Sequence, residues 1–204
     1  MSVRKMAMIK NELAPGIVVY SNVLDQTTPL HIQLETAMKS VGIPWEDAYV
    51  QSEGQSKVDK TSRDTLTFVL RYSDTPLDKF DTPKQSFFSS LSNLLLQKFM
   101  PVEDDYKRMF ATDSQTHEPY AFLKYGVGQN FINHVDDYQN RRKISTVYYS
   151  NDDYTGGEIV FPRFGLTYKP KADEMILFPS TYTYNHSVLP VESGTRYAIV
   201  SWLA

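Results

Sequence analysis

The second half of the chain is a succession of short apolar runs separated by turn-forming residues. From residue 118 to the C-terminus these runs read EPYAFLKYG, KISTVYYSNDD, GGEIVFP, EMILFPS, YNHSVLP and GTRYAIVSWLA. They are rich in aromatic and β-branched residues, which favour strands. Several short strands at roughly even spacing are typical of a β-sandwich or barrel. The sequence therefore predicts a jelly roll over residues 118–204.

The first half alternates strand and helix patterns. A β-branched run at 16–20 precedes a helical pattern, in which Thr28 is a candidate cap, Pro29 suits the first turn and Gly42 can end the helix. Leu30, Leu34, Ala37, Met38 and Val41 form the apolar stripe of this helix.

A strand is then expected at 64–72, followed by a second helix over 81–100. Thr82 is a plausible cap for this helix, and Pro101 follows its end. A shorter helical piece is expected at 102–110. Because no segment has the composition of a linker, we predict one α+β domain, residues 1–204, in which the helix-rich half, residues 1–117, supports the jelly-roll half, residues 118–204.

Composition restricts the chemistry. The chain of 204 residues has a net charge of −3 and a pI of about 5.8, which disfavours nucleic acid as a partner. It contains no cysteine, so any metal must be held by nitrogen and oxygen. No run of eighteen apolar residues and no signal peptide is evident, so we expect a soluble, cytoplasmic protein with no membrane partner.

A His-x-Asp pair lies in the stretch FINHVDDYQN. In a strand, His134 and Asp136 point to the same face and could hold one metal ion, whereas Asp137 points to the opposite face. A polar strand end is the plain alternative. Of the other histidines, His31 is expected on a helix surface or in packing, and His117 is expected to face solvent.

His186 is different, because it lies in a strand-like run fifty residues beyond Asp136. A sheet that closes on itself can bring these two runs together. Two imidazoles and one carboxylate form the facial triad of non-haem Fe(II) oxygenases.

Ten residues beyond His186, Arg196 begins the last strand and shares a face with Ala198, Val200 and Trp202. A buried guanidinium would need an anionic partner, whereas an arginine at a strand edge would simply reach solvent.

The ordered set of His134, Asp136, His186 and Arg196 resembles the Fe(II)/2-oxoglutarate-dependent dioxygenases, and within them the prolyl 4-hydroxylase-like group. Three segments carry the resemblance between about Glu118 and Trp202: YGVGQNFINHVD, GGEIVFP and HSVLPVESGTRYAIVSW. The resemblance implies a double-stranded β-helix, or cupin-like jelly roll, with supporting N-terminal helices. It also implies that His134, Asp136 and His186 bind Fe(II) as the catalytic centre.

The same resemblance assigns Arg196 to the distal carboxylate of the cosubstrate 2-oxoglutarate. Tyr125 and Tyr149 match tyrosines that contact this cosubstrate, although simple core packing explains them equally well. Gly156 and Gly157 need no more than a turn role. The implied reaction hydroxylates an unactivated C–H bond and releases succinate and CO2, with ascorbate as reductant.

Peptidyl proline is the substrate that the resemblance implies, and a free amino acid or other small molecule is the alternative. Alkylated-DNA repair dioxygenases carry a second arginine six residues after the first, where this chain has Trp202. A cupin-like metal-binding domain without oxygen chemistry, and a jelly-roll interaction protein without metal, also stay open. The polar segment 49–64 is either a mobile lid or an ordinary surface loop.

Overall fold

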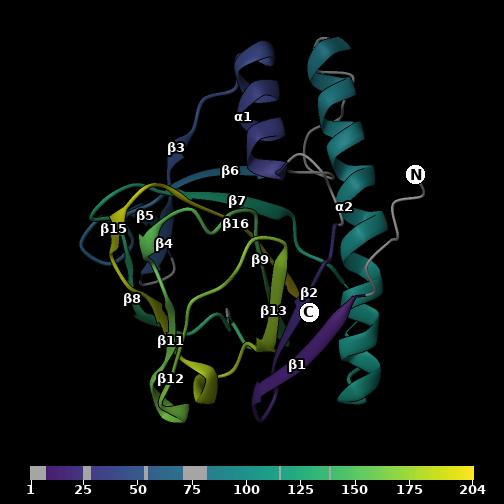
Figure 1. Ribbon diagram of the computed structural model, residues 1–204, viewed down its shortest axis with the longest axis vertical. Helices are drawn as coiled ribbons and strands as arrows, with labels where there is room; N and C mark the ends of the chain where they lie inside the picture. The colour runs from purple at the N-terminus through teal and green to yellow at the C-terminus, as the bar shows by residue number, and fades with distance from the viewer. Residues whose placement is uncertain (1–7, 25–28, 53–54, 71–81, 115, 138) are drawn as a thin grey trace.

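The computed structural model describes residues 8–24, 29–52, 55–70, 82–114, 116–137 and 139–204. Its largest element is an antiparallel sheet of eight strands (Figure 1). In spatial order the strands are β1 (Ile9–Ala14), β2 (Ile17–Ser21), β13 (Glu174–Pro179), β9 (Ile144–Tyr149), β16 (Arg196–Leu203), β7 (Tyr120–Tyr125), β6 (Leu66–Leu70) and β3 (Glu46–Asp47).

A second antiparallel sheet faces the first. It has four strands in the order β12 (Leu166–Tyr168), β11 (Ile159–Phe161), β14 (His186–Val188) and β8 (Phe131–His134). Two short ribbons complete the strands: β10 (Thr155–Gly156) with β15 (Val191–Ser193), and β4 (Tyr49–Ser52) with β5 (Gln55–Val58). Short 3-10 turns lie at Pro162–Phe164 and Tyr182–Tyr184. Two facing antiparallel sheets joined in this way form a double-stranded β-helix, so the predicted fold is confirmed.

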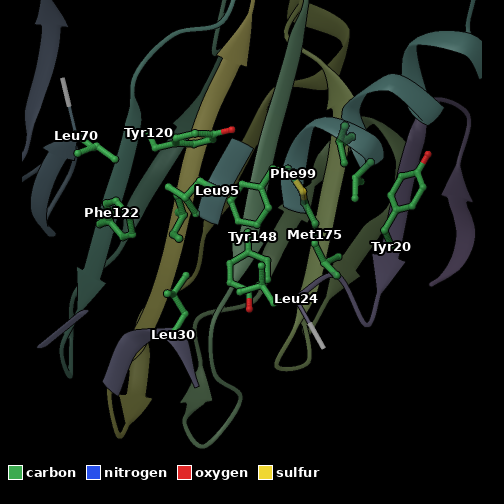
Figure 2. Close-up of a cluster of buried hydrophobic side chains, with 14 of the residues drawn as sticks. Tyr20, Leu24, Leu30, Leu70, Leu95, Phe99, Tyr120, Phe122, Tyr148 and Met175 are labelled. Carbon is green, nitrogen blue, oxygen red and sulfur yellow. The ribbon is translucent and has the colours of Figure 1, made fainter. Parts of the chain in front are cut away.

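Helices α1 (Leu30–Val41) and α2 (Thr82–Met109) cover the outer face of the large sheet (Figure 1). Their buried side chains pack between the helices and the strands in one apolar cluster (Figure 2). From the helices it includes Leu30, Leu34, Met38, Leu91, Leu95, Phe99, Val102 and Tyr106, and from the strands Tyr20, Tyr120, Phe122, Tyr148, Met175 and Ile199. Of the predicted stripe of α1, Leu30, Leu34 and Met38 are buried, whereas Ala37 and Val41 are half-buried.

The other face of the large sheet belongs to a second cluster, which fills the space between the two sheets. It includes Leu123, Tyr125, Val147, Tyr149, Ile176, Phe178, Ala198 and Val200 from the large sheet, and Ile159, Phe161 and Val188 from the small one. Central strands such as β7, β9 and β16 are therefore buried on both faces, with alternate residues entering opposite clusters. The residues that enter the inter-sheet cluster are those that surround the candidate site.

The helices differ from expectation in one respect. The structure has one continuous α2 from Thr82 to Met109 with Pro101 inside it, so the predicted end before Pro101 is wrong. Phe99 lies before the proline and Val102 and Tyr106 lie after it, and all three are buried against the sheet. Their packing outweighs the backbone cost of an interior proline, which is about 3 kcal/mol.

The remaining boundaries agree with the sequence where they can be compared. Gly42 ends α1 in the left-handed conformation, with φ of 68°, as predicted. The predicted cap Thr28, the end of the expected strand at 71–72 and the expected start of the second helix at residue 81 lie outside the described residues. Neither described helix combines the length and the apolar character needed to cross a lipid bilayer.

Candidate active site

Two histidines from neighbouring strands meet at one edge of the small sheet. His134 ends β8 and His186 begins β14, and the two are direct partners in the antiparallel register. Asp136 follows two residues after His134. Its carboxylate oxygens lie 3.5 Å from Nε2 of His134 and 3.7 Å from Nε2 of His186. The structure therefore brings the three predicted ligands together, with candidate ligand atoms all within 4.8 Å of one another. Asp137 does not belong to this group.

Hydrogen bonds fix which nitrogen of each ring faces the group. Nδ1 of His134 lies 2.9 Å from the carbonyl oxygen of Ile132, and Nδ1 of His186 lies 3.1 Å from that of Tyr184. A carbonyl can only accept, so each Nδ1 must carry a proton and donate. Each neutral imidazole then presents the lone pair of Nε2 towards Asp136, which is the arrangement that metal-bound histidines adopt. The donor set and its orientation fit a divalent metal such as Fe(II).

The protonation states agree with this assignment. Burial opposes ionisation of Asp136, but His186 and His134 outweigh it and hold the pKa of Asp136 well below its usual range. Burial and the neighbouring His134 lower the pKa of His186 to about 4. At neutral pH the group therefore offers a carboxylate and a neutral imidazole, the forms that bind metal.

Arg142 holds the backbone of Asp136 in place. It forms two hydrogen bonds to the carboxylate of Glu118, at 2.7 and 2.6 Å, and its guanidinium lies 3.6 Å from the ring centroid of Trp202. From this position Nη1 donates to the carbonyl oxygen of Asp136 at 3.1 Å. The next amide, that of Asp137, donates to Ser180 at 2.9 Å. The peptide group between Asp136 and Asp137 is thus fixed at both its carbonyl and its amide.

Arg196 lies in the interior between the sheets. It pairs with Tyr125 in the register of β16 and β7, and only 1% of its surface is exposed, so the solvent-facing alternative is wrong. Its guanidinium carbon lies 4.7 Å from the ring centroid of Tyr125 and 5.0 Å from that of Tyr149. Nε and Nη1 are buried without a hydrogen-bond partner, and no carboxylate in the described part of the chain pairs with this arginine.

Two buried hydroxyl groups accompany this guanidinium. Those of Tyr149 and Tyr154 also have no hydrogen-bond partner. Burial raises the pKa of both tyrosines although Arg196 opposes the change, so both hydroxyls stay protonated and can donate. A buried cation with neighbouring donors needs an anion, and a carboxylate matches the guanidinium geometry best. The residues present therefore fit the distal carboxylate of 2-oxoglutarate.

Gly157 has a more specific place than the turn role expected from the sequence. Its φ is +66°, and a Cβ atom added to it would lie 3.0 Å from Cδ of Arg196 and 3.1 Å from Cε2 of Tyr154. Only glycine leaves this space to the arginine. Tyr154, Gly157 and Arg142 are the neighbours of the site that sequence reasoning missed, because no pattern of spacing relates them to the ligands.

A large open pocket of about 1070 Å³ joins the ligand group to Arg196. Its walls include His134, Asp136, His186 and Arg196 on the side of the sheets. The β4–β5 hairpin and the turn after it also line the pocket, through residues such as Tyr49, Val50, Lys57 and Arg63. The segment 49–64, a candidate lid, therefore borders the pocket in its described part; its motion stays a prediction.

The other histidines lie apart from the ligand group. His31 stacks on the ring of Tyr197 at 4.9 Å, which agrees with a packing position. His117 was expected to face solvent, and this expectation is wrong. Its Nε2 lies 3.0 Å from the buried carboxylate of Glu103, and Nδ1 lies 2.6 Å from the carbonyl of Glu118. His117 therefore links α2, through Glu103, to the segment before β7, through Glu118.

Known families and curated proteins resemble this chain in sequence, mainly in its second half. The family model of the 2OG-Fe(II) oxygenase superfamily matches residues 120–204. A PKHD-type hydroxylase of Prochlorococcus marinus (strain MIT 9215) is 33% identical over 109 residues, which are 50% of this chain and 48% of the relative. Another, from Rhizorhabdus wittichii, is 35% identical over 98 residues, which are 42% of each chain. The chain thus spans about half the length of the curated relatives it matches.

Solved structures agree on the fold. A prolyl hydroxylase from Trichoplax adhaerens, in complex with a peptide fragment of the hypoxia inducible factor oxygen degradation domain, superposes with a TM-score of 0.65 at 19% identity, over 92% of this chain and 83% of that one. A prolyl-4-hydroxylase from Pseudomonas putida gives a TM-score of 0.60 at 17% identity, over 92% of both chains. At this level of identity the likeness establishes the double-stranded β-helix alone.

Proposed function

The chain belongs to the 2OG-Fe(II) oxygenase superfamily through residues 120–204, and on this premise we propose that it is a hydroxylase that uses Fe(II) and 2-oxoglutarate. The observation that carries the proposal is the shared pocket of two unlike sites. One is the group of His134, Asp136 and His186, and the other is the buried, unpaired guanidinium of Arg196. A metal-binding domain without oxygen chemistry would account for the first site but not for the second.

In this proposal Nε2 of each histidine and the carboxylate of Asp136 would hold Fe(II). The chemistry that Fe(II) supplies when bound is the use of O2 to convert 2-oxoglutarate to succinate and CO2 while a substrate C–H becomes C–OH. The two carbonyls that accept from Nδ1 keep both imidazoles in the tautomer that binds metal. Arg142 keeps Asp136 in register with them.

Arg196 receives the distal carboxylate of 2-oxoglutarate, and the rings of Tyr125 and Tyr149 hold the guanidinium between them. The hydroxyls of Tyr149 and Tyr154 are free to donate to the same carboxylate. Because this end of the interior is apolar, the ion pair forms away from water, where it is strongest.

For the prime substrate we propose peptidyl proline. Support comes from the fold shared with the Trichoplax adhaerens enzyme, whose structure contains a peptide fragment, and from a pocket that is open enough for a chain segment. A free amino acid or other small molecule is the alternative substrate class. Ascorbate is the expected reductant, as is typical of the group.

The decisive experiment adds Fe(II) and 2-oxoglutarate to the protein without oxygen and records the visible charge-transfer band of the chelate. We expect the band in the wild type and in Asp137→Asn, and its loss in Asp136→Ala, because only Asp136 faces the two histidines. In Arg196→Met the band should need at least ~30-fold more 2-oxoglutarate, since the partner of a buried carboxylate is lost. No band in the wild type would exclude the oxygenase. Mass spectrometry of proline peptides and free amino acids after aerobic incubation then identifies the substrate class by a gain of one oxygen.

A further inference from the structure

Two of the three arginines that line the pocket have a carboxylate partner or a role in the proposed function, and in the described part of the chain the third has neither. Arg63, Arg142 and Arg196 all line it. Arg142 is already paired with Glu118, and Arg196 is assigned to 2-oxoglutarate. Arg63 has no carboxylate partner among the residues that the structure describes. Its guanidinium donates to the carbonyl oxygen of Tyr49 at 3.0 Å, and its Nε is buried without any partner.

Arg63 is held by its backbone, unlike a freely moving surface arginine. It forms a β-bridge with Phe131, the first residue of β8. On either side of this bridge, the amide of Ile132 donates to Ser62 and the amide of Asp64 donates to Asn130, each at 2.9 Å. The backbone of Arg63 is therefore fixed on the wall of the pocket, and the contacts of its guanidinium with Tyr49 and Phe131 restrain the side chain before a ligand binds.

The two acidic side chains nearest to Arg63 in the sequence, Asp59 and Asp64, are engaged elsewhere. The carboxylate of Asp59 accepts hydrogen bonds from Thr61 and Ser62 of the same turn. The carboxylate of Asp64 accepts from Nε2 of Gln129 at 2.8 Å. Lys57, on β5, also lines the pocket and adds a charge of the same sign. Glu46 and Asp137 also line the pocket, so the preference for an anion rests on the position and unmet Nε–H of Arg63 and not on the net charge of the wall.

The position of Arg63 relates it to the metal ligands through one aromatic ring. The guanidinium carbon lies 4.9 Å from the ring centroid of Phe131. The same ring stacks on the imidazole of His134, with centroids 3.5 Å apart and planes at 13°. An anion bound at Arg63 would thus lie beside the reacting centre. It would be held by the wall of β8 and the hairpin, whereas Arg196 belongs to β16.

We propose that Arg63 is an anion-binding subsite for the prime substrate, and that this substrate carries a carboxylate close to the carbon that is hydroxylated. The carboxylate belongs either to an acidic residue beside the target residue of a peptide or to a free acid. This inference rests on the proposed function for its link to catalysis. A neutral segment would leave the guanidinium without an ionic partner, so the subsite discriminates against it.

The subsite is tested by the binding of acetate and of its neutral isostere acetamide. Saturation transfer from the protein to the methyl group of each probe is measured by NMR on the metal-free protein with 2-oxoglutarate present. We expect transfer to acetate to exceed that to acetamide in the wild type, and the excess to fall about tenfold in Arg63→Gln, the worth of one charge-assisted hydrogen bond. Arg63→Lys should retain part of it.

Arg108→Gln is the matched control, because it removes one positive charge from the exposed surface of α2, where Arg108 contacts Asp105 at 3.6 Å. It should leave the preference for acetate unchanged. Equal transfer in wild type and Arg63→Gln, or no preference for acetate in the wild type, would overturn the subsite. The readout needs neither iron nor turnover, so it fails separately from the proposed activity, which stands or falls on the charge-transfer band.

Discussion

Gly157 has no side chain, and the space that a Cβ atom would need is occupied by Arg196. In Gly157→Ala the new methyl group would lie 3.0 Å from Cδ of Arg196, so the guanidinium must shift. We expect weaker binding of 2-oxoglutarate, by about tenfold, and a loss of about 1–2 kcal/mol in unfolding free energy from the left-handed backbone. Titration of the charge-transfer band measures the first effect and urea unfolding the second.

Gly165→Ala separates crowding from backbone strain. Gly165 also has a positive φ, +57°, but no atom lies within 4 Å of an added Cβ. This variant should lose a similar amount of stability and bind 2-oxoglutarate as the wild type does. If both variants bound it equally, the close approach of Gly157 to Arg196 would have no functional meaning.

Substitution of Arg142 is expected to change the affinity for the metal rather than for the cosubstrate. In Arg142→Gln the carbonyl of Asp136 loses its donor and Glu118 loses its partner in the pocket wall. We expect the affinity for Co(II), followed by its visible absorption, to fall by about 10-fold or more, as for other residues that orient metal ligands. The exposed neighbour Arg141 provides the control, since Arg141→Gln should bind Co(II) normally. Unchanged affinity in Arg142→Gln would show that Asp136 is fixed without it.

Residue by residue, the sequence predicted what depends on short spacing. The spacing of two predicted that His134 and Asp136 would lie together, and they do, although β8 ends at His134. Alternation grouped Arg196 with Ala198, Val200 and Trp202 but did not decide whether this face is buried. Arg142, Tyr154 and Gly157 could not be found in this way. Each acts through a contact with a distant segment, such as Glu118 for Arg142 or Arg196 for Gly157, and spacing carries no information on those contacts.

At the scale of elements, α2 shows how packing overrides a local signal. A proline normally ends a helix, yet Pro101 is exposed while Phe99 and Val102 on either side of it are buried. Pro101→Ala should restore a backbone donor and relieve the steric clash without changing the core. We expect unfolding free energy to rise by about 2 kcal/mol, the helix cost of proline less the entropy it removes from the unfolded chain.

Pro83 supplies the comparison, because it lies in the first turn of the same helix, where proline is well tolerated. Pro83→Ala should give no gain in urea unfolding. If Pro101→Ala gave none either, α2 would tolerate the interior proline without cost.

His117 joins α2 to the large sheet and makes this junction depend on pH. Burial disfavours the charged imidazole, but the hydrogen bond to Glu103 and the charge of that residue outweigh it and raise the pKa of His117. Because the folded pKa is raised, the stabilisation is complete below the unfolded value of about 6.5 and is lost as pH rises through the folded value. Urea unfolding should therefore show a larger difference between wild type and His117→Gln at about pH 6 than at about pH 9.

For the whole molecule, the order of strands in the large sheet shows whether the two halves of the chain can form separate domains. The family model matches only residues 120–204, but β7 pairs with β6 and β13 pairs with β2, so strands of the first half extend the large sheet on both sides. This topology supports the predicted single domain, which sequence texture alone could not establish, because strands that pair across long stretches of sequence leave no local pattern.

A substitution on α2 tests that prediction. Leu95 is fully buried between the helices and the sheet, whereas Leu96 is 37% exposed. We expect Leu95→Ala to lose about 2–5 kcal/mol of unfolding free energy and Leu96→Ala less than about 1. In one domain, the helical circular dichroism and the fluorescence of Trp202, recorded in a Trp45→Phe background, should shift to lower urea together. If the helices melted first while Trp202 kept its wild-type midpoint, the chain would hold two units.

Folded Leu95→Ala should still bind Fe(II) and 2-oxoglutarate, because Leu95 packs on the helix side of the large sheet and the candidate site lies on the other side.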